Sequence, residues 1–173
     1  MFNYKIIDNL ISPSECQQII ETYKPLLGEL IEFTDYQHSR YNFSNIALSD
    51  LLFERIKNQL PDEIVEISHK WYMSHYQADQ GSISEHFDGN ILWSDKISRY
   101  TFLIYLNDNF KEGETVINDP RYRRHIPIAP RTGRILLLDQ DMLHYAKKPT
   151  EGDKYILRSD LMVMTEKEKE KQD

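Results

Sequence analysis

Four residues in the second half of the chain have side chains and spacing suited to metal chemistry: His86, Asp88, His144 and Lys154. His86 and Asp88 are two positions apart, so in an extended segment they point to the same side. Two imidazoles and one carboxylate on one face of a metal ion suit Fe(II) and leave open positions for a chelating co-substrate and dioxygen. A lysine near the far end of a chelated dicarboxylate would provide its charge partner.

The segments around these residues resemble the 2-oxoglutarate- and Fe(II)-dependent dioxygenases, in particular the prolyl 4-hydroxylase-like branch. The resemblance extends from about Arg40 to Met164, and order and spacing agree along it. The family usually has Gly-Gly before Glu-Thr, and Glu112 replaces the first of these glycines here. The matching stretches are residues 76–89, 101–108, 112–115, 130–139 with His144, and 152–160.

The resemblance implies a role for each member of the motif. His86, Asp88 and His144 would be the metal ligands, and Lys154 would hold the distal carboxylate of 2-oxoglutarate. Arg158 is the alternative cation, because it lies four residues further on the same strand face and some related dioxygenases have an arginine near that distance.

Three hydroxyl-bearing residues, Tyr76, Thr101 and Tyr105, match positions that contact 2-oxoglutarate in the family. Thr101 and Tyr105 share a strand face, which permits a joint role. The alternative is that the tyrosines are packing residues whose hydroxyl groups find local partners.

Substrate contacts are expected from two segments. Residues 88–98 are interpreted as a lid over the metal, with Trp93 as an exposed anchor. Arg40 and Asn42 resemble an Arg-x-Asn element of relatives that reaches the substrate, although a turn with a structural salt bridge would also explain them. The other histidines, His38, His69, His75 and His125, are interpreted as structural or surface residues.

By this resemblance the chain would hydroxylate an unactivated C–H bond while 2-oxoglutarate is decarboxylated to succinate and carbon dioxide, with ascorbate as reductant. A prolyl residue in a peptide is the favoured substrate, and a free amino acid or another small metabolite is the alternative. Three rival classes are a nucleic-acid demethylase, a zinc hydrolase and a non-catalytic jelly-roll binding module. A zinc hydrolase would leave Lys154, Thr101 and Tyr105 unexplained.

Composition limits the remaining possibilities. The chain has 173 residues and a net charge of −7, which argues against an extended surface for nucleic acid. We expect one domain over residues 1–165 and a charged, disordered tail over residues 166–173. Neither a signal peptide nor a membrane span is recognisable, and Cys16 is the only cysteine, so a cytoplasmic protein is expected. The oligomeric state stays open.

The pattern of apolar, capping and turn residues along the chain predicts a mainly β fold with flanking helices (α+β). Ser12, Pro13 and Glu15 form a capping-box start for one helix, which Pro25 would kink or end, and a second helix should run from Ser49 or Asp50 to Pro61. Short strands punctuated by turn residues follow from about residue 64. The family resemblance sharpens this to a double-stranded β-helix, or jelly roll, with the N-terminal helices packed on one face.

Overall fold

The structure is a computed structural model, and it describes residues 2–33, 36–79, 82–119 and 124–165. The predicted tail, residues 166–173, lies outside the described residues. The strands are β1 (Tyr4–Ile7), β2 (Leu30–Phe33), β3 (Tyr36–Ser44), β4 (Ile64–Ile67), β5 (Lys70–Tyr76), β6 (Ile83–His86), β7 (Leu92–Trp93), β8 (Lys96–Tyr105), β9 (Lys111–Glu112), β10 (Thr115–Asp119), β11 (Arg124–Ile128), β12 (Ile135–Asp139), β13 (His144–Ala146), β14 (Pro149–Glu151) and β15 (Lys154–Met164). The helices are α1 (Pro13–Tyr23) and α2 (Ile46–Ile56), each followed by a short 3₁₀ turn, at Lys24–Leu26 and Lys57–Gln59.

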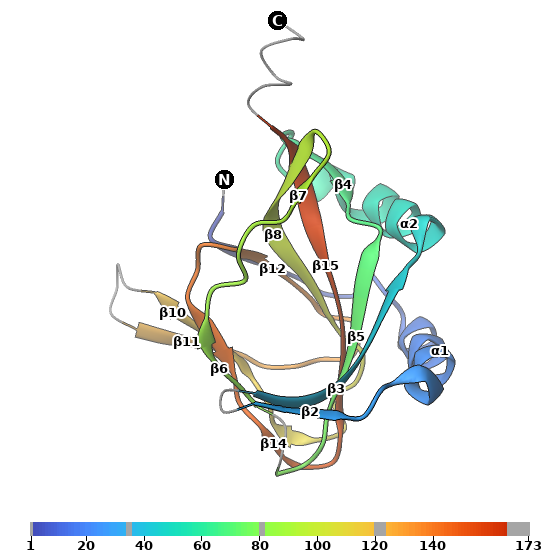
Figure 1. Cartoon of the computed structure of the whole chain (residues 1–173), viewed down its shortest axis with the longest axis vertical. Helices are drawn as coiled ribbons and strands as arrows, with labels where there is room; N and C mark the ends of the chain where they lie inside the picture. Colours follow the sequence, from blue (N-terminus) through green and yellow to red (C-terminus); the bar gives the residue numbers. More distant parts are fainter. Residues whose placement is uncertain (1, 34–35, 80–81, 120–123, 166–173) are drawn as a thin grey trace, which may run out of the picture.

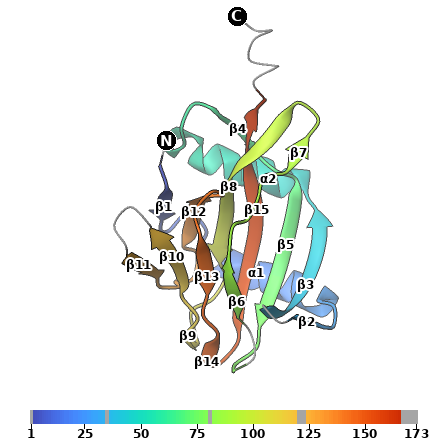
Figure 2. The same cartoon turned by 60° about the vertical axis from the view of Figure 1, so that its left-hand side comes forward.

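The antiparallel strands curl into the predicted jelly roll. Their order is β1-β12-β8-β15-β5-β3-β6-β13-β10-β11, with β2, β4 and β7 paired beside this path. The long strands β8, β15 and β5 form a major sheet, and β6, β13, β10 and β11 cross in front of it (Figure 2). Both helices pack on the outer face of the major sheet, as expected (Figure 1). The inner face is therefore left for the space between the two halves of the roll.

The main core lies between the helices and the major sheet. Cys16 and Ile20 of α1 and Ile56 of α2 pack with Trp71 and Leu157 of the sheet. The indole N–H of Trp71 donates to the Ser49 hydroxyl at 3.0 Å, which ties α2 to β5. Because strand residues alternate between faces, each strand that contributes an apolar side chain to this core presents its next residue to the inner space.

The N-terminal third agrees with the prediction for the first helix and departs from it in two ways. The capping box of Ser12 and Glu15 is present, and α1 ends at Tyr23, just before the 3₁₀ turn that contains Pro25, as expected. The second helix begins at Ile46 rather than Ser49 or Asp50, because the Asn45 side chain accepts from the Leu48 N–H and caps it earlier. This third, expected to be helical, also contains strands β1, β2 and β3.

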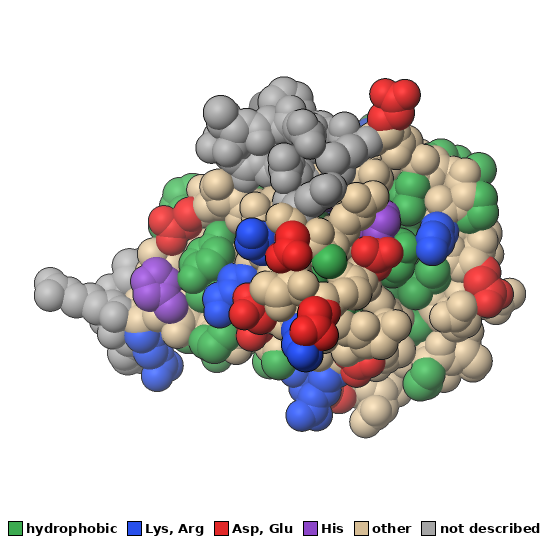
Figure 3. Space-filling model, turned by 90° about the horizontal axis from the view of Figure 1, so that it is seen from below, with side chains coloured by type: hydrophobic (Ala, Val, Ile, Leu, Met, Phe, Trp, Pro, Cys, Tyr) green, Lys and Arg blue, Asp and Glu red, His purple; other side chains and the backbone are tan. Residues whose placement is uncertain are grey.

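Two surface features bear on the rival classes. None of the helices in the described part of the chain combines the length and apolar character that crossing a bilayer requires. Figure 3 shows one face of the molecule, on which acidic and basic side chains are interspersed. That face carries no single-sign stripe of the kind that follows a phosphate backbone.

Candidate metal and co-substrate site

A cavity of about 570 Å³ lies between the two halves of the jelly roll. On its major-sheet wall, strands β3, β5 and β15 pair in register and present three cross-strand rows. The inner row is Tyr76 and Lys154, with His38 stacked on Tyr76; the middle row is Arg40, Ser74 and Ile156; the outer row is Tyr72 and Arg158, with Asn42 opposite Tyr72 beyond the lining. Apolar residues such as Leu136 and Leu138 complete the walls. The cavity therefore has chemically distinct ends, with Lys154 at one and Arg158 toward the other.

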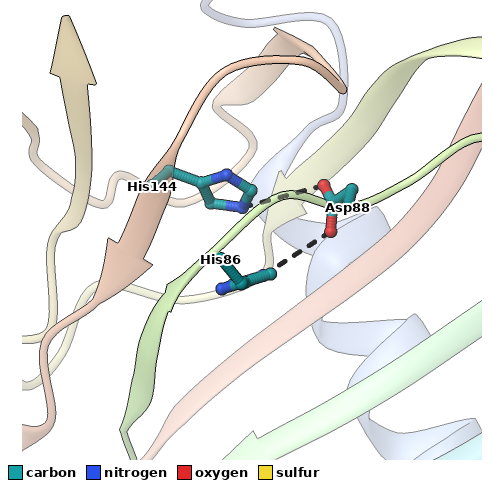
Figure 4. Close-up of side chains that lie close together, drawn as sticks. All are labelled: His86, Asp88 and His144. Atoms are coloured by element: carbon teal, nitrogen blue, oxygen red, sulfur yellow. Dashed lines mark ion pairs between the residues drawn. The ribbon is translucent and has the colours of Figure 1, made fainter. Parts of the chain in front are cut away.

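The three predicted ligands converge near the outer row. The imidazole nitrogens of His86 and His144 and a carboxylate oxygen of Asp88 all lie within 4.8 Å of one another (Figure 4). The His86 Nε2–Asp88 Oδ1 distance is 3.6 Å, and His144 Nε2 lies 3.7 Å from Asp88 Oδ2. His86 is directly opposite His144 in the antiparallel β6–β13 pair, so the sheet register itself brings the two rings together. An ion placed among the three could bind all of them.

Hydrogen bonds select the ring nitrogen that each histidine offers. His86 Nδ1 lies 2.7 Å from the Ser84 carbonyl oxygen, and His144 Nδ1 lies 3.0 Å from the Met142 carbonyl oxygen. A carbonyl oxygen can only accept, so both Nδ1 atoms carry hydrogen, and in the neutral rings both Nε2 atoms keep a lone pair. Because both Nε2 lone pairs face Asp88, the donor set fits a divalent ion such as Fe(II).

The site keeps its carboxylate ionised. Burial alone would raise the pKa of Asp88, but the adjacent His86 ring, when it is protonated, and the charge of Arg158 hold that pKa well below its usual range. Burial lowers the pKa of His144, which favours the neutral imidazole that a metal requires. Burial would likewise lower the pKa of His86, but the adjacent Asp88 carboxylate raises it, so a proton and a metal ion compete for this ring.

Lys154 is buried at the inner end of the cavity, with 2% of its surface exposed. Its ammonium donates to the Gly113 carbonyl oxygen at 2.8 Å and lies 5.1 Å and 5.7 Å from the ring centroids of Tyr76 and Tyr105. Among the described residues this is its one hydrogen bond, although an ammonium group has three donors. A buried cation that lines a cavity and has donors to spare fits the distal carboxylate of a dicarboxylate.

The other residues predicted to bind the co-substrate lie in three different places: beside Asp88, at the inner end of the cavity, and behind the cavity lining. The Thr101 hydroxyl donates to Asp88 Oδ2, and Arg158 Nη2 lies 3.1 Å from Asp88 Oδ1, so both contact the proposed metal ligand. Tyr76 lines the inner end beside Lys154. The hydroxyl of Tyr105 donates to Thr115 Oγ1 at 2.8 Å, and Thr115 rather than Tyr105 lines the cavity.

The predicted substrate residues also differ in position. Arg40 is exposed and lines the cavity, with its guanidinium carbon 5.3 Å from the Tyr72 ring centroid. Asn42 is exposed on the same face of β3 but outside the cavity lining. Trp93 is 56% exposed, also lies outside the lining, and packs under the Lys70 ammonium at 4.1 Å. Of these three, Arg40 has the position that a substrate entering the cavity would meet.

His38 was missed by the sequence analysis, which interpreted it as a structural or surface residue. It is 5% exposed, lines the cavity and stacks on Tyr76 with 5.2 Å between ring centroids. Strand alternation could have placed His38 in the cavity wall, because His38 and Arg40 are two positions apart in β3 and therefore share a face. Tyr72 and Ser74 in β5 were missed for the same reason, since they precede Tyr76 at even spacing on the cavity face.

A family model described as the 2OG-Fe(II) oxygenase superfamily matches residues 71–159, which is about half of the chain and contains every proposed metal ligand. The chain belongs to this superfamily, as the sequence analysis expected. A comparison with curated protein sequences gives no match.

Solved structures of low sequence identity share the fold. A viral collagen prolyl hydroxylase from Paramecium Bursaria Chlorella virus-1, in complex with 2OG, is 18% identical with a TM-score of 0.69, covering 94% of this chain and 97% of that one. A Pseudomonas putida prolyl-4-hydroxylase is 12% identical with a TM-score of 0.70, covering 94% of each chain. A Trichoplax adhaerens prolyl hydroxylase, in complex with a hypoxia inducible factor peptide fragment, is 19% identical with a TM-score of 0.70, covering 99% of this chain and 87% of that one.

Proposed function

We propose that this chain is an Fe(II)- and 2-oxoglutarate-dependent hydroxylase of the prolyl 4-hydroxylase-like branch. The observation that carries the proposal is one cavity with a His-Asp-His ligand set near one end and a buried ammonium at the other. Residues 1–165 would form a single dioxygenase domain, with ascorbate as the reductant. A prolyl residue in a peptide is the favoured substrate, in line with the peptide-bound prolyl hydroxylase that shares the fold.

Each part of the cavity would have a different role in binding. His86, Asp88 and His144 would hold Fe(II), and Lys154 would hold the distal carboxylate of 2-oxoglutarate. When bound together, Fe(II), 2-oxoglutarate and dioxygen supply the oxidising chemistry for an unactivated C–H bond. The apolar walls formed by Leu136, Leu138 and their neighbours would limit the access of water to the reacting groups. Thr101 and Arg158 would orient the Asp88 carboxylate, and no side chain is required as a general base.

The alternative substrate is a free amino acid or another small metabolite, and Arg40 is the observation that favours one with a carboxylate. Within the described residues Arg40 forms no ion pair, and its guanidinium stands at the cavity next to Tyr72. A guanidinium of this kind binds a carboxylate through paired hydrogen bonds. The same side chain could also bind an acidic group of a peptide, and an assay with both kinds of substrate distinguishes the two.

The first test is succinate formation from 2-oxoglutarate by the purified protein with Fe(II), ascorbate and air. We expect a basal signal that is lost in His86→Ala and kept in His125→Ala, whose exposed ring lies outside the cavity. Proline-containing peptides and then free amino acids are added to find the substrate that raises the rate. No succinate, together with no 2-oxoglutarate binding to the anaerobic metal-loaded protein, would overturn the co-substrate assignment and favour a binding module.

A further inference from the structure

A chain of polar contacts runs inward from the carboxylate of Asp88. Arg158 Nη2 lies 3.1 Å from Asp88 Oδ1 and 3.4 Å from Asp160 Oδ1, so one nitrogen with two hydrogens bridges both carboxylates. Asp160 Oδ1 also accepts from Gln140 Nε2 at 2.8 Å. Asp160 is 2% exposed and Gln140 is fully buried, so these contacts form where unpaired polar groups are costly.

The same chain returns to the segment that carries Asp88. Gln140 Oε1 accepts from the Ser98 hydroxyl at 2.8 Å and from Asn90 Nδ2 at 3.2 Å. Asn90 Nδ2 also donates to the Ser98 carbonyl oxygen at 2.8 Å. Asn90 is two residues after Asp88, and Gly89 between them has a φ of +72°. The contacts therefore close a ring that holds residues 88–90 at both ends.

In this ring one cation, Arg158, lies between two carboxylates, Asp88 and Asp160. Arg158 is a cation beside a carboxylate that would bind a metal cation, so its charge opposes metal binding even while its hydrogen bond orients Asp88. The Asp160 carboxylate offsets that charge and draws the guanidinium toward the interior. Gln140 orients Asp160 in turn. The Gln140 side-chain Nε2 donates to Asp160, and its Oε1 accepts from Ser98 and Asn90, so the orientation of the amide is set.

We propose that Asp160 and Gln140 are positioning residues for the metal centre, which act through Arg158 to orient the Asp88 carboxylate and to offset the guanidinium charge beside it. This inference rests on the proposed function, because it takes His86, Asp88 and His144 as metal ligands. It also gives Arg158 a role at the metal end, which leaves Lys154 as the cation for the distal carboxylate of 2-oxoglutarate.

The test is the affinity for Mn(II) alone, measured anaerobically by calorimetric titration of the full chain. Asp160→Asn keeps the size of the side chain and an acceptor for Gln140, and removes the charge. We expect it to weaken Mn(II) binding about 10- to 100-fold, the range for residues that support metal ligands. Gln140→Leu is expected to act in the same direction by a smaller factor.

A double-mutant cycle separates an action through Arg158 from a direct one. In the Arg158→Gln background, Asp160→Asn should no longer change the Mn(II) affinity, because the charge that Asp160 offsets is gone. An equal loss in both backgrounds would overturn the proposal. So would an unchanged Mn(II) affinity in Asp160→Asn.

Asp139→Asn is the matched control. Asp139 is 7% exposed and pairs with Arg99 at 3.1 Å, a comparable aspartate–arginine contact with no contact to the triad. A purely structural role of Asp160 would lower the unfolding midpoints of Asp160→Asn and Asp139→Asn alike and leave their Mn(II) affinities equal. His86→Ala separates the two hypotheses: if it too retains full Mn(II) affinity, the metal site itself is wrong, whereas its loss beside an unchanged Asp160→Asn refutes the positioning role alone.

Discussion

At the metal end of the cavity each proposed ligand is held by hydrogen bonds, whereas Lys154 at the inner end is surrounded by aromatic rings. His86 and His144 are oriented by backbone carbonyl oxygens, and Asp88 is contacted by both Thr101 and Arg158. Lys154 has one hydrogen bond among the described residues and is otherwise enclosed by Tyr76 and Tyr105.

This contrast separates two ways of preparing a site before its ligand arrives. The metal end is ordered by contacts that persist when the ion is absent, so its geometry is set in advance. The inner end instead contains a charge without a counter-ion in contact, which costs stability until an anion arrives. Substitutions at the two ends should therefore have opposite consequences for the free energy of unfolding.

The largest effect is expected at the metal end. Asp88→Asn keeps the shape of the side chain but removes the negative charge, so Mn(II) binding and succinate formation should both fall below detection. The metal-free protein should also become less stable, because Arg158 loses one of its two carboxylate contacts. Calorimetric titration and denaturant unfolding measure the two effects, and full turnover in this variant would refute Asp88 as a ligand.

Lys154→Met should have the next largest effect on activity and the reverse effect on stability. Loss of a buried charge partner costs about 3–5 kcal/mol, so the KM for 2-oxoglutarate should rise by roughly 10²- to 10⁴-fold while Mn(II) affinity is kept. The metal-free variant should be at least as stable as the parent, because an unpaired buried charge is replaced by an apolar chain of similar length. Lys111→Met, at an exposed ion pair with Glu151, is the control for both measurements.

The pH dependence of stability should come mainly from the inner end. Burial lowers the pKa of Lys154 from its ordinary value of 10.5 to about 7. Between these values the unfolded chain binds more protons than the folded one, so the free energy of unfolding should rise with pH from about 7 to 10. The rise should be absent in Lys154→Met, as measured by denaturant unfolding of the metal-free protein. A rise of equal size in both proteins would show that another group causes it.

Protonated Lys154 is the form that can hold a carboxylate, so 2-oxoglutarate affinity should change in the opposite direction. The dissociation constant of 2-oxoglutarate for the Mn(II)-loaded protein should increase as pH rises above about 7. Titrations at several pH values measure this. A constant affinity up to pH 9 would mean that the ammonium stays charged or takes no part.

Substitution of two glycines should have the smallest effects on stability and activity, and should still distinguish the metal end of the cavity from the inner end. Gly89 and Gly113 have φ of +72° and +75°, so alanine at either position costs about 1–2 kcal/mol of unfolding free energy. A Cβ at Gly89 would meet no atom within 4 Å, whereas one at Gly113 would lie 2.9 Å from Phe110 and 3.4 Å from the Lys154 side chain. Only Gly113→Ala should therefore raise the KM for 2-oxoglutarate, by a few fold.

The mainly β fold was predicted from the short apolar strands, and the family resemblance correctly implied the jelly roll. The convergence of His86, Asp88 and His144 agrees with the spacing of the motif. Strand β3 was missed because its inner face, including His38, Arg40 and Asn42, is polar where it lines or borders the cavity, so no apolar alternation marks it. Glu112 keeps a positive φ of 59° at the position where the family has glycine, so the turn persists despite the substitution.

The contact of Arg158 with the metal end could not be predicted from strand spacing. Arg158 lies on the same strand face as Lys154, as predicted, but a separation of four residues in a strand places the two about 13 Å apart. That distance brings Arg158 to Asp88, which arrives from a segment far away in the sequence. The hydrogen bond of Gln140 to Asp160 likewise joins the residue after β12 to the middle of β15, and these two places are neighbours only after the sheet has formed.

The pairing of His86 with His144 has a mechanical consequence. Strand β6 is short, and apart from its pairing with β13 it meets β3, within the described residues, at one registered position, Tyr36 with Ile83. An ion shared by His86 and His144 would cross-link two distant parts of the chain much as a disulfide does, and would reduce the entropy of the opened state. Metal loading would then protect β6 from proteases and slow its amide hydrogen exchange, well before any co-substrate binds.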